Sequence, residues 1–209
     1  MNILIACEES QIVCKEFRLK GHNAFSCDIQ MTSGKNPEWH IWQDVTKYLN
    51  GKCEFLTCDG QKHYIEKWDM IIAFPPCTYI TKASGNSLIQ NGKINQERFE
   101  KGLKAKIFFE KIYNAKCKKI VIENPTPLKI FNLPTHNQTI QPYYFGEIYS
   151  KSTNLWIKGL PLLTPTNIIK PKYSFNNYPP FKNCNGKYRA KARSKTPLGI
   201  AKAMAEQWG

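Results

Sequence analysis

Short runs rich in apolar residues, bounded by polar and turn-forming segments, recur along the chain and predict β-strands. In 70–74 and 119–122 the apolar residues are nearly continuous instead of alternating, which is typical of strands covered on both faces of a parallel sheet. We expect strands over 2–6, 23–27, 70–74, 119–122, 140–145 and 153–157.

Apolar residues at helical spacing predict helices between these strands. The clearest helix covers 95–115, where Phe99, Leu103, Ile107 and Ile112 recur among lysines and glutamates. It lies between two predicted strands, and a strand–helix–strand unit of this length makes the two strands parallel. Further helices are expected over 8–19 and 197–208, and a short helical stretch after Asp44.

The remaining segments carry weaker patterns. Residues 30–43 are polar and irregular, 50–67 favour no element, and 161–183 are rich in proline and asparagine and indicate an irregular excursion. A chain of 209 residues suits one domain with a sizeable core. We therefore expect a single α/β domain over 1–209, with a mostly parallel sheet and helices on both faces, from which a basic segment of about 164–196 extends.

Composition indicates an intracellular protein without metal. The sequence has no apolar run long enough for a membrane span, and its first residues lack the features of a signal peptide. The eight cysteines show no recurring paired spacing and are expected to be reduced thiols. Cys53, Cys58 and His63 match no standard zinc pattern, so no metal site is predicted.

Charge is distributed unevenly along the chain. The net charge is +14, and no acidic residue occurs between Glu147 and Glu206, where eleven lysines and arginines alternate with tyrosines and phenylalanines. Such a segment is typical of a surface that binds nucleic-acid phosphates and stacks on bases, although a solvated lysine-rich face would look the same. The candidate DNA-binding residues are Lys187, Arg189, Lys191, Arg193 and Lys195.

Two short strings follow predicted strands, and they carry the most specific chemistry. They are Pro75-Pro76-Cys77 and Glu123-Asn124-Pro125. The carboxyl ends of parallel strands meet at one edge of a sheet, so the thiol and the carboxyl group are expected side by side. A thiolate can attack an electron-poor ring carbon while a carboxylic acid protonates the same ring, and cytosine is the first candidate for that ring.

Polar residues also follow the first strands, where a nucleoside cofactor binds in folds of this class. The glycine-rich turn that would be the strong signal is absent. Asp28 ends the second strand, in the usual position for a carboxylate that binds ribose hydroxyls, and Asp44 lies on a third loop. The candidate cofactor-binding residues are Cys7, Glu8, Glu9, Ser10, Asp28, Asp44 and Pro75.

Taken together, these motifs and their order resemble the DNA cytosine-5 methyltransferases. The whole chain is similar to a compact phage and prophage group of that family, whose typical strings include Gln138-Thr139-Ile140-Gln141-Pro142 and 155–161. The resemblance implies a Rossmann-like S-adenosylmethionine-dependent methyltransferase fold, double-stranded DNA as substrate and the bacterial cytoplasm as location. The final predicted helix resembles the closing helix of the family.

The resemblance also implies a role for each residue of the site. Cys77 would attack carbon 6 of a flipped-out cytosine, and Glu123 would bind or protonate nitrogen 3. Lys151 would help to hold the base, or Arg189 or Arg193 would do so in its place. Pro75 and Pro76 would stiffen the loop, and Asn124 would hold it through hydrogen bonds. These residues would act with S-adenosylmethionine to methylate carbon 5.

The sequence departs from the family in ways that leave alternatives open. It lacks the glycines of the first motif and has no large target-recognition domain, so either the segment 164–196 or an accessory subunit would recognise the target. One alternative is modification of cytosine in RNA or nucleotides. Another is a degenerate, non-catalytic methyltransferase fold that binds DNA.

Overall fold

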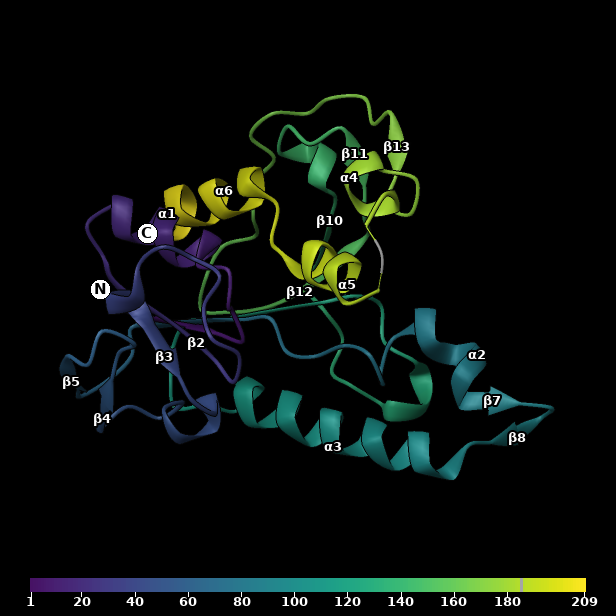
Figure 1. Ribbon diagram of the computed structural model, residues 1–209, viewed down its shortest axis with the longest axis horizontal. Coiled ribbons are helices and arrows are strands. Elements are labelled where there is room, and N and C mark those ends of the chain that lie inside the picture. Colours follow the sequence, from purple (N-terminus) through teal and green to yellow (C-terminus); the bar gives the residue numbers. More distant parts are fainter. Residues whose placement is uncertain (185) are drawn as a thin grey trace.

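A seven-stranded, mostly parallel sheet forms the centre of the computed structural model (Figure 1). The structure describes residues 1–184 and 186–209, apart from the side chains of Ser84 and Lys187. The strand order is β10-β12-β9-β6-β1-β2-β3. All neighbouring strands pair in parallel except β12, which runs antiparallel to both β9 and β10. The expected α/β class with a mostly parallel sheet is confirmed.

The strands of this sheet are short and buried. Their bounds are β1 Asn2–Ala6, β2 Asn23–Asp28, β3 His40–Trp42, β6 Met70–Ala73, β9 Ile120–Asn124, β10 Gln138–Ile140 and β12 Thr153–Lys158. The side chains of β1, β6 and β9 are buried at nearly every position, as the continuous apolar runs predicted.

Two apolar layers cover the two faces of the sheet. On one face, α1 (Ile12–Leu19) and α6 (Leu198–Trp208) pack against the sheet and against each other. On the other face lie α3 (Gln96–Tyr113) and the small hairpin of β4 (Cys53–Leu56) and β5 (Lys62–Ile65). Figure 1 shows α1 and α6 on the opposite side of the sheet from α3. The burial of both faces gives the sheet its stability.

Several elements differ from their predicted bounds for local reasons. The first helix begins at Ile12, not at residue 8, because Cys7 and Gln11 adopt left-handed backbone conformations with φ of 59° and 60°. The strand predicted over 140–145 is wrong beyond Ile140, since Pro142 has no backbone N–H for a ladder and starts the 3-10 turn Pro142–Tyr144. Strand β3 and the β4–β5 hairpin lie in segments to which no strand was assigned.

The segment expected to be irregular contains ordered elements. They are the strand β13 (Tyr173–Ser174) and the helices α4 (Pro179–Lys182) and α5 (Gly186–Ser194). Strand β13 pairs with β11 (Tyr149–Ser150), which lies before the segment. Tyr149 stacks on Tyr178 with ring centroids 4.5 Å apart, and its ring lies edge-on to that of Phe181 at 5.4 Å. The aromatic residues of this segment therefore pack against Tyr149 and against one another.

A smaller cluster holds the loop that follows β6. This loop carries α2 (Gly85–Leu88) and the hairpin of β7 (Ile89–Gln90) and β8 (Lys93–Ile94). Ile80, Leu88 and Phe131 are buried together beside α3. Gly102 of α3 lies directly against the Phe131 ring, and a Cβ atom at this position would be 2.2 Å from its Cζ. No helix in the described part of the chain is long and apolar enough to cross a membrane.

The close contact between Gly102 and the Phe131 ring predicts that Gly102→Ala destabilises the protein, although alanine is the better helix former. Because the Phe131 ring is enclosed, we expect a loss of roughly 1–3 kcal/mol in the free energy of unfolding, measured by urea denaturation. Adding Phe131→Leu should recover part of that loss, and Lys104→Ala at an exposed position should stay within about 0.5 kcal/mol of wild type. A Gly102→Ala protein as stable as wild type would contradict this close packing.

Candidate functional site

The candidate site lies at the carboxyl ends of the parallel strands, where the strand order reverses. The chain goes from β1 outward through β2 to β3, then crosses to β6 and β9 on the other side of β1. In open α/β sheets, ligands bind in the crevice at such a switch point. The segments that follow β1, β6 and β9 here are those that contain Cys7, Cys77 and Pro125.

Cys77 and Glu123 are brought together by two loops that are bonded to each other. The Lys82 amide donates to the Thr126 carbonyl at 2.9 Å, and the Leu128 amide donates to the Ile80 carbonyl at 2.7 Å. The two loops therefore continue the contact between the parallel strands β6 and β9 beyond the end of the sheet. A pair of side chains on such fixed backbones is held in place before a ligand arrives.

Asn124 adds a third connection between these loops. Its side chain is 1% exposed, and its Nδ2 donates to the Pro75 carbonyl at 3.3 Å. The residue thus holds the Pro-Pro-Cys loop, as predicted for it. Pro75 is buried, whereas Pro76 is exposed. Two buried acceptors at this place, Asn124 Oδ1 and Glu123 Oε1, have no hydrogen-bond partner among the described residues. Unpaired buried acceptors of this kind are costly, and a ligand with donor groups would satisfy them.

The charges of the site act on both reactive groups. Burial raises the pKa of the Cys77 thiol, the Glu123 carboxylate raises it further, and the positive charge of Lys151 lowers it. Burial also raises the pKa of Glu123, opposed by Lys151 and by the Thr153 hydroxyl. A carboxyl group with a raised pKa keeps its proton more readily, which suits a group that must donate a proton to a ring nitrogen.

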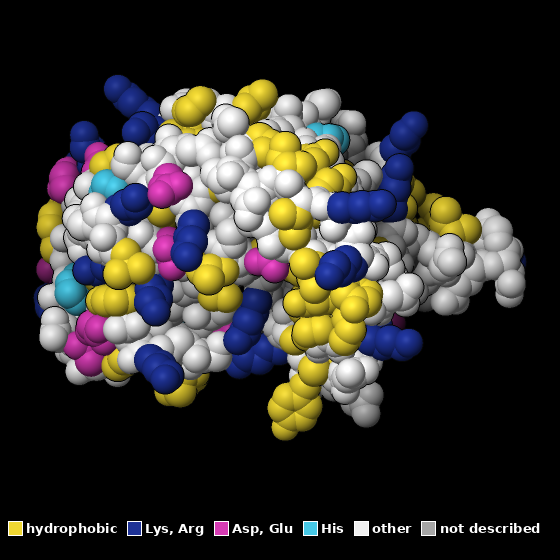
Figure 2. All heavy atoms as spheres, turned by 90° about the horizontal axis from the view of Figure 1, so that it is seen from above, with side chains coloured by type: hydrophobic (Ala, Val, Ile, Leu, Met, Phe, Trp, Pro, Cys, Tyr) yellow, Lys and Arg dark blue, Asp and Glu magenta, His cyan; other side chains and the backbone are white. Residues whose placement is uncertain are grey.

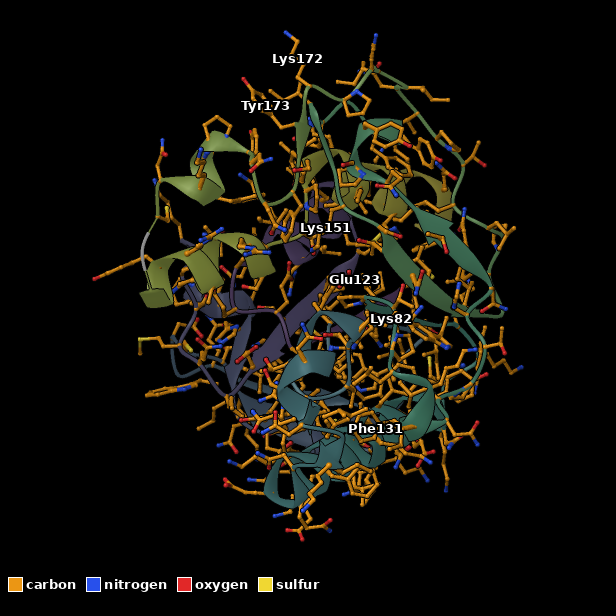
Figure 3. All side chains as sticks on the ribbon, turned by 90° about the vertical axis from the view of Figure 1, so that its right-hand side faces the viewer. Lys82, Glu123, Phe131, Lys151, Lys172 and Tyr173 are labelled. Atoms are coloured by element: carbon orange, nitrogen blue, oxygen red, sulfur yellow. The ribbon has the colours of Figure 1, made fainter. Side chains whose placement is uncertain are left out.

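Lys151, which lies just before β12, is near this pair. Its backbone amide donates to Gln141 Oε1 at 2.9 Å, and its Nζ lies 5.2 Å from the centroid of the Phe175 ring. In Figure 3, Lys82, Glu123 and Lys151 lie in the middle of the view, with Tyr173 above them and Phe131 below. The sequence prediction that Lys151 belongs with Cys77 and Glu123 agrees with these charges and contacts.

The loop after β1 is folded around two buried carboxyl groups. Glu8 is 4% exposed, and its two oxygens accept the backbone amides of Val13 and Cys14 at 2.7 and 3.1 Å. It therefore caps the N-terminus of α1. Burial raises the pKa of Glu8 to about 7 against these hydrogen bonds. Both oxygens of Glu8 thus have partners within the chain. A contact between Glu8 and a cofactor stays a prediction.

Glu9 is differently placed. It is 7% exposed, its Oε2 accepts the Ser33 amide at 3.0 Å, and the Nζ of Lys191 lies 3.5 Å from the same oxygen. Its Oε1 is buried with no partner among the described residues. Ser10 donates a long hydrogen bond of 3.5 Å to Glu8 Oε1. Lys191, predicted to contact DNA, thus joins α5 to the candidate cofactor loop.

Asp28 and Asp44 lie at neighbouring loop ends. Asp28 Oδ1 accepts the Gln30 amide at 2.8 Å, and burial raises the pKa of this carboxyl group. Asp44 is exposed and accepts the amide and the hydroxyl of Thr46. Both carboxylates raise the pKa of the Cys7 thiol, after the larger effect of burial. Cys7, Asp28 and Asp44 are therefore near enough to interact electrostatically. That they surround one ligand stays a prediction.

The remaining candidates are on or near α5. Arg189 and Arg193 occupy one face of the helix, and Lys195 is exposed just beyond its end. The side chain of Lys187 lies outside the described residues. Figure 2 views the molecule from above. It shows many lysines and arginines spread over this face among hydrophobic side chains, while acidic side chains are fewer and mostly on the left of the view.

Sequence reasoning missed two residues of the site. Phe175 lies between Lys151 and Arg193, with the guanidinium of Arg193 4.3 Å from its ring centroid. Arg98 of α3 donates to the carbonyl of Thr78, the residue after Cys77, at 3.1 Å. The alternation of aromatic and basic residues indicated the first of these in kind, but nothing in the sequence places Arg98 beside Thr78.

Comparison with known proteins adds no relative. No protein-family model matches the chain, and a search of curated proteins finds no match. Among the described residues, no group of three or more His, Cys, Asp or Glu side chains is arranged to hold a metal ion. The case for a function therefore rests on the residues and geometry of this chain.

The buried Glu8 predicts a specific dependence of stability on pH. Its folded pKa of about 7 lies above its usual value of 4.5, so its stabilising effect is complete below about pH 4.5 and is lost as the pH rises through 7. Relative to Glu8→Gln, which does not titrate, wild type should lose up to about 3 kcal/mol of unfolding free energy between about pH 5 and 8.

The measurement is urea denaturation of both proteins across this pH range, with Glu100→Gln as a control that removes an exposed carboxylate from α3. A difference between wild type and Glu8→Gln that does not change with pH would show that Glu8 is not a buried titrating cap.

Proposed function

We propose that this protein is a DNA methyltransferase that transfers a methyl group from S-adenosylmethionine to carbon 5 of cytosine through a covalent bond to Cys77. The observation that carries the proposal is the arrangement of Cys77 beside Glu123. The Glu123 Oε1 is buried without a partner among the described residues, and the two loops that carry the pair are bonded to each other. This arrangement suits a nucleophile and an acid that act on one ring.

The fold supports the proposal. The five strands β3-β2-β1-β6-β9 follow the order of doubly wound sheets that bind nucleosides, and α1, α6 and α3 cover both faces. This arrangement is compatible with the Rossmann-like methyltransferase fold that the sequence motifs imply. Fold alone does not define an activity, so the proposal rests on the residues of the site.

The residues of the site suit each step on the ring. The Cys77 sulfur, after losing its proton, adds to carbon 6, while Glu123 gives its proton to nitrogen 3, so that carbon 5 becomes electron-rich. Lys151 favours the thiolate because its charge lowers the pKa of Cys77. After methylation, a base takes the carbon 5 proton, the Cys77 thiolate departs, and nitrogen 3 returns its proton to Glu123, which restores the aromatic ring. The base must be flipped out of the duplex to reach these groups.

The loop after β1 fits the cofactor in its chemistry. S-adenosylmethionine supplies the methyl group and carries an ammonium, a sulfonium and ribose hydroxyls. Glu9 Oε1, which is buried and unpartnered among the described residues, is an acceptor for a cationic donor, and Asp28 at the end of β2 is an acceptor for hydroxyls. Pro75 and Cys7 would border the same site. Glu8 would contribute indirectly, by holding the start of α1.

The first prediction for this function concerns Cys77. Wild type incubated with cytosine-containing duplex DNA and tritiated S-adenosylmethionine should produce 5-methylcytosine, measured by nucleoside mass spectrometry. Cys77→Ser should produce none, whereas Cys184→Ser, which changes a cysteine of the α4–α5 connection, should be active. Label in RNA but not in DNA would support the alternative substrate, and no label and no cofactor binding would support a non-catalytic DNA-binding protein.

The second prediction concerns Glu123. Glu123→Gln keeps the shape of the side chain but cannot donate the proton that activates the ring. We expect the rate of methyl transfer to fall by at least about 100-fold, while DNA binding stays close to that of wild type. Gel-shift binding and single-turnover methylation, measured on the same preparation, separate the two effects. A variant with an unchanged rate would remove Glu123 from the mechanism.

A further inference from the structure

The two arginines of α5 form a positive site, and neither has an ion pair with an acidic side chain among the described residues. Arg189 and Arg193 are four residues apart, so they share one face of the helix, and with Gly186 and Ala190 they line a hollow of about 420 Å³. The Nε of Arg189 is buried with no hydrogen-bond partner among the described residues. Burial and the charge of Arg189 both lower the pKa of Arg193. Two guanidinium groups held this close favour an anion between them.

Neighbouring side chains leave these charges in place. Arg193 donates to the Asn176 amide oxygen at 2.9 Å, which orients the guanidinium without neutralising it. Lys191 forms an ion pair with Glu9. Residues two positions apart on a helix do not share a face, so this ion pair does not neutralise the two arginines. The sequence offers no acidic residue between Glu147 and Glu206.

The Phe175 ring and Lys151 connect this site to the reactive pair. Arg193 lies 4.3 Å from the centroid of the Phe175 ring, and Lys151 lies 5.2 Å from the same centroid. Lys151 in turn acts electrostatically on Cys77 and Glu123. An anion at the arginines would therefore be close to a base at Cys77, as the phosphate of a nucleotide is close to its base.

We infer that Arg189 and Arg193 form a binding site for a backbone phosphate next to the target cytidine. Guanidinium groups bind phosphate oxygens through paired, charge-assisted hydrogen bonds, and the Nε of Arg189, unpartnered among the described residues, supplies one donor. The inference rests on the proposed function, because it takes a polynucleotide as the substrate. It also assigns different roles to the predicted DNA-binding residues. Arg189 and Arg193 bind phosphate, while Lys191 holds α5 to the loop after β1.

The test is the salt dependence of DNA binding, measured by fluorescence anisotropy with a labelled duplex and without S-adenosylmethionine. The double variant Arg189→Gln/Arg193→Gln should bind about tenfold more weakly than wild type. The slope of log K against log salt should fall by about 1 for each phosphate group that the variant no longer neutralises. Lys118→Gln, an exposed lysine before β9 at the opposite end of the strands, is the matched control and should keep the wild-type slope.

A slope unchanged in the double variant, or lowered equally in Lys118→Gln, would overturn the inference. Should the glutamine variant melt early, Arg189→Lys/Arg193→Lys keeps the charges. It should keep the slope but bind more weakly, since an ammonium group cannot bind two phosphate oxygens in parallel; unchanged affinity would contradict the site.

Competition with cytidine monophosphate and with inorganic phosphate distinguishes the source of the phosphate. Backbone recognition predicts that neither displaces the duplex at concentrations where an unlabelled duplex does. Displacement by the free nucleotide would overturn it. The binding assay involves no methyl transfer. A protein that shows the predicted salt slopes but no methylation would therefore contradict the proposed function and leave the phosphate site in place.

Discussion

The candidate site depends on the bonding between the loops that follow β6 and β9. Parallel strands bring their carboxyl ends together, but loops leaving a sheet usually diverge. Here the backbone bonds from Lys82 to Thr126 and from Leu128 to Ile80, with the bond from Asn124 to Pro75, keep them in contact. Loss of the bond from Asn124, which is 1% exposed, would leave a buried amide group unpaired, which costs about 1–3 kcal/mol. Cys77 and Glu123 are thus fixed side by side by the fold itself.

Around this fixed pair, the C-terminal third of the chain completes the site. The antiparallel strand β12 pairs with β9 and places Thr153 and the preceding Lys151 next to Glu123. The aromatic packing around Tyr149 brings α4 and Phe175 to the same side. Helix α5 is then attached at two points, through Arg193 to Asn176 and Phe175, and through Lys191 to Glu9. One helix thereby contacts both the candidate cofactor loop and the aromatic residue Phe175 beside Lys151.

The parts of the structure that are governed by local patterns could be predicted from the sequence. Continuous apolar runs indicated β1, β6 and β9 to within one or two residues, and apolar spacing indicated α3. Elements set by tertiary contacts were not predicted. Glu8 caps α1 from outside the helix, so the sequence pattern does not reveal where α1 begins. Helix α5 is mostly polar and lacks the apolar stripe that would indicate a helix packed on a core. The order of the motifs predicted that Cys77 and Glu123 would meet. The positions of Arg98 and Phe175 required the fold.

The proposed covalent bond between Cys77 and cytosine can be tested directly by one experiment. A duplex in which fluorine replaces the hydrogen at carbon 5 of cytosine is incubated with the protein and S-adenosylmethionine. Because fluorine cannot leave as a cation, elimination is blocked and the adduct persists through denaturation. The proposed mechanism predicts a protein–DNA complex that carries one added methyl group and maps to the peptide containing Cys77. No such complex, or a complex attached at another cysteine, would contradict it.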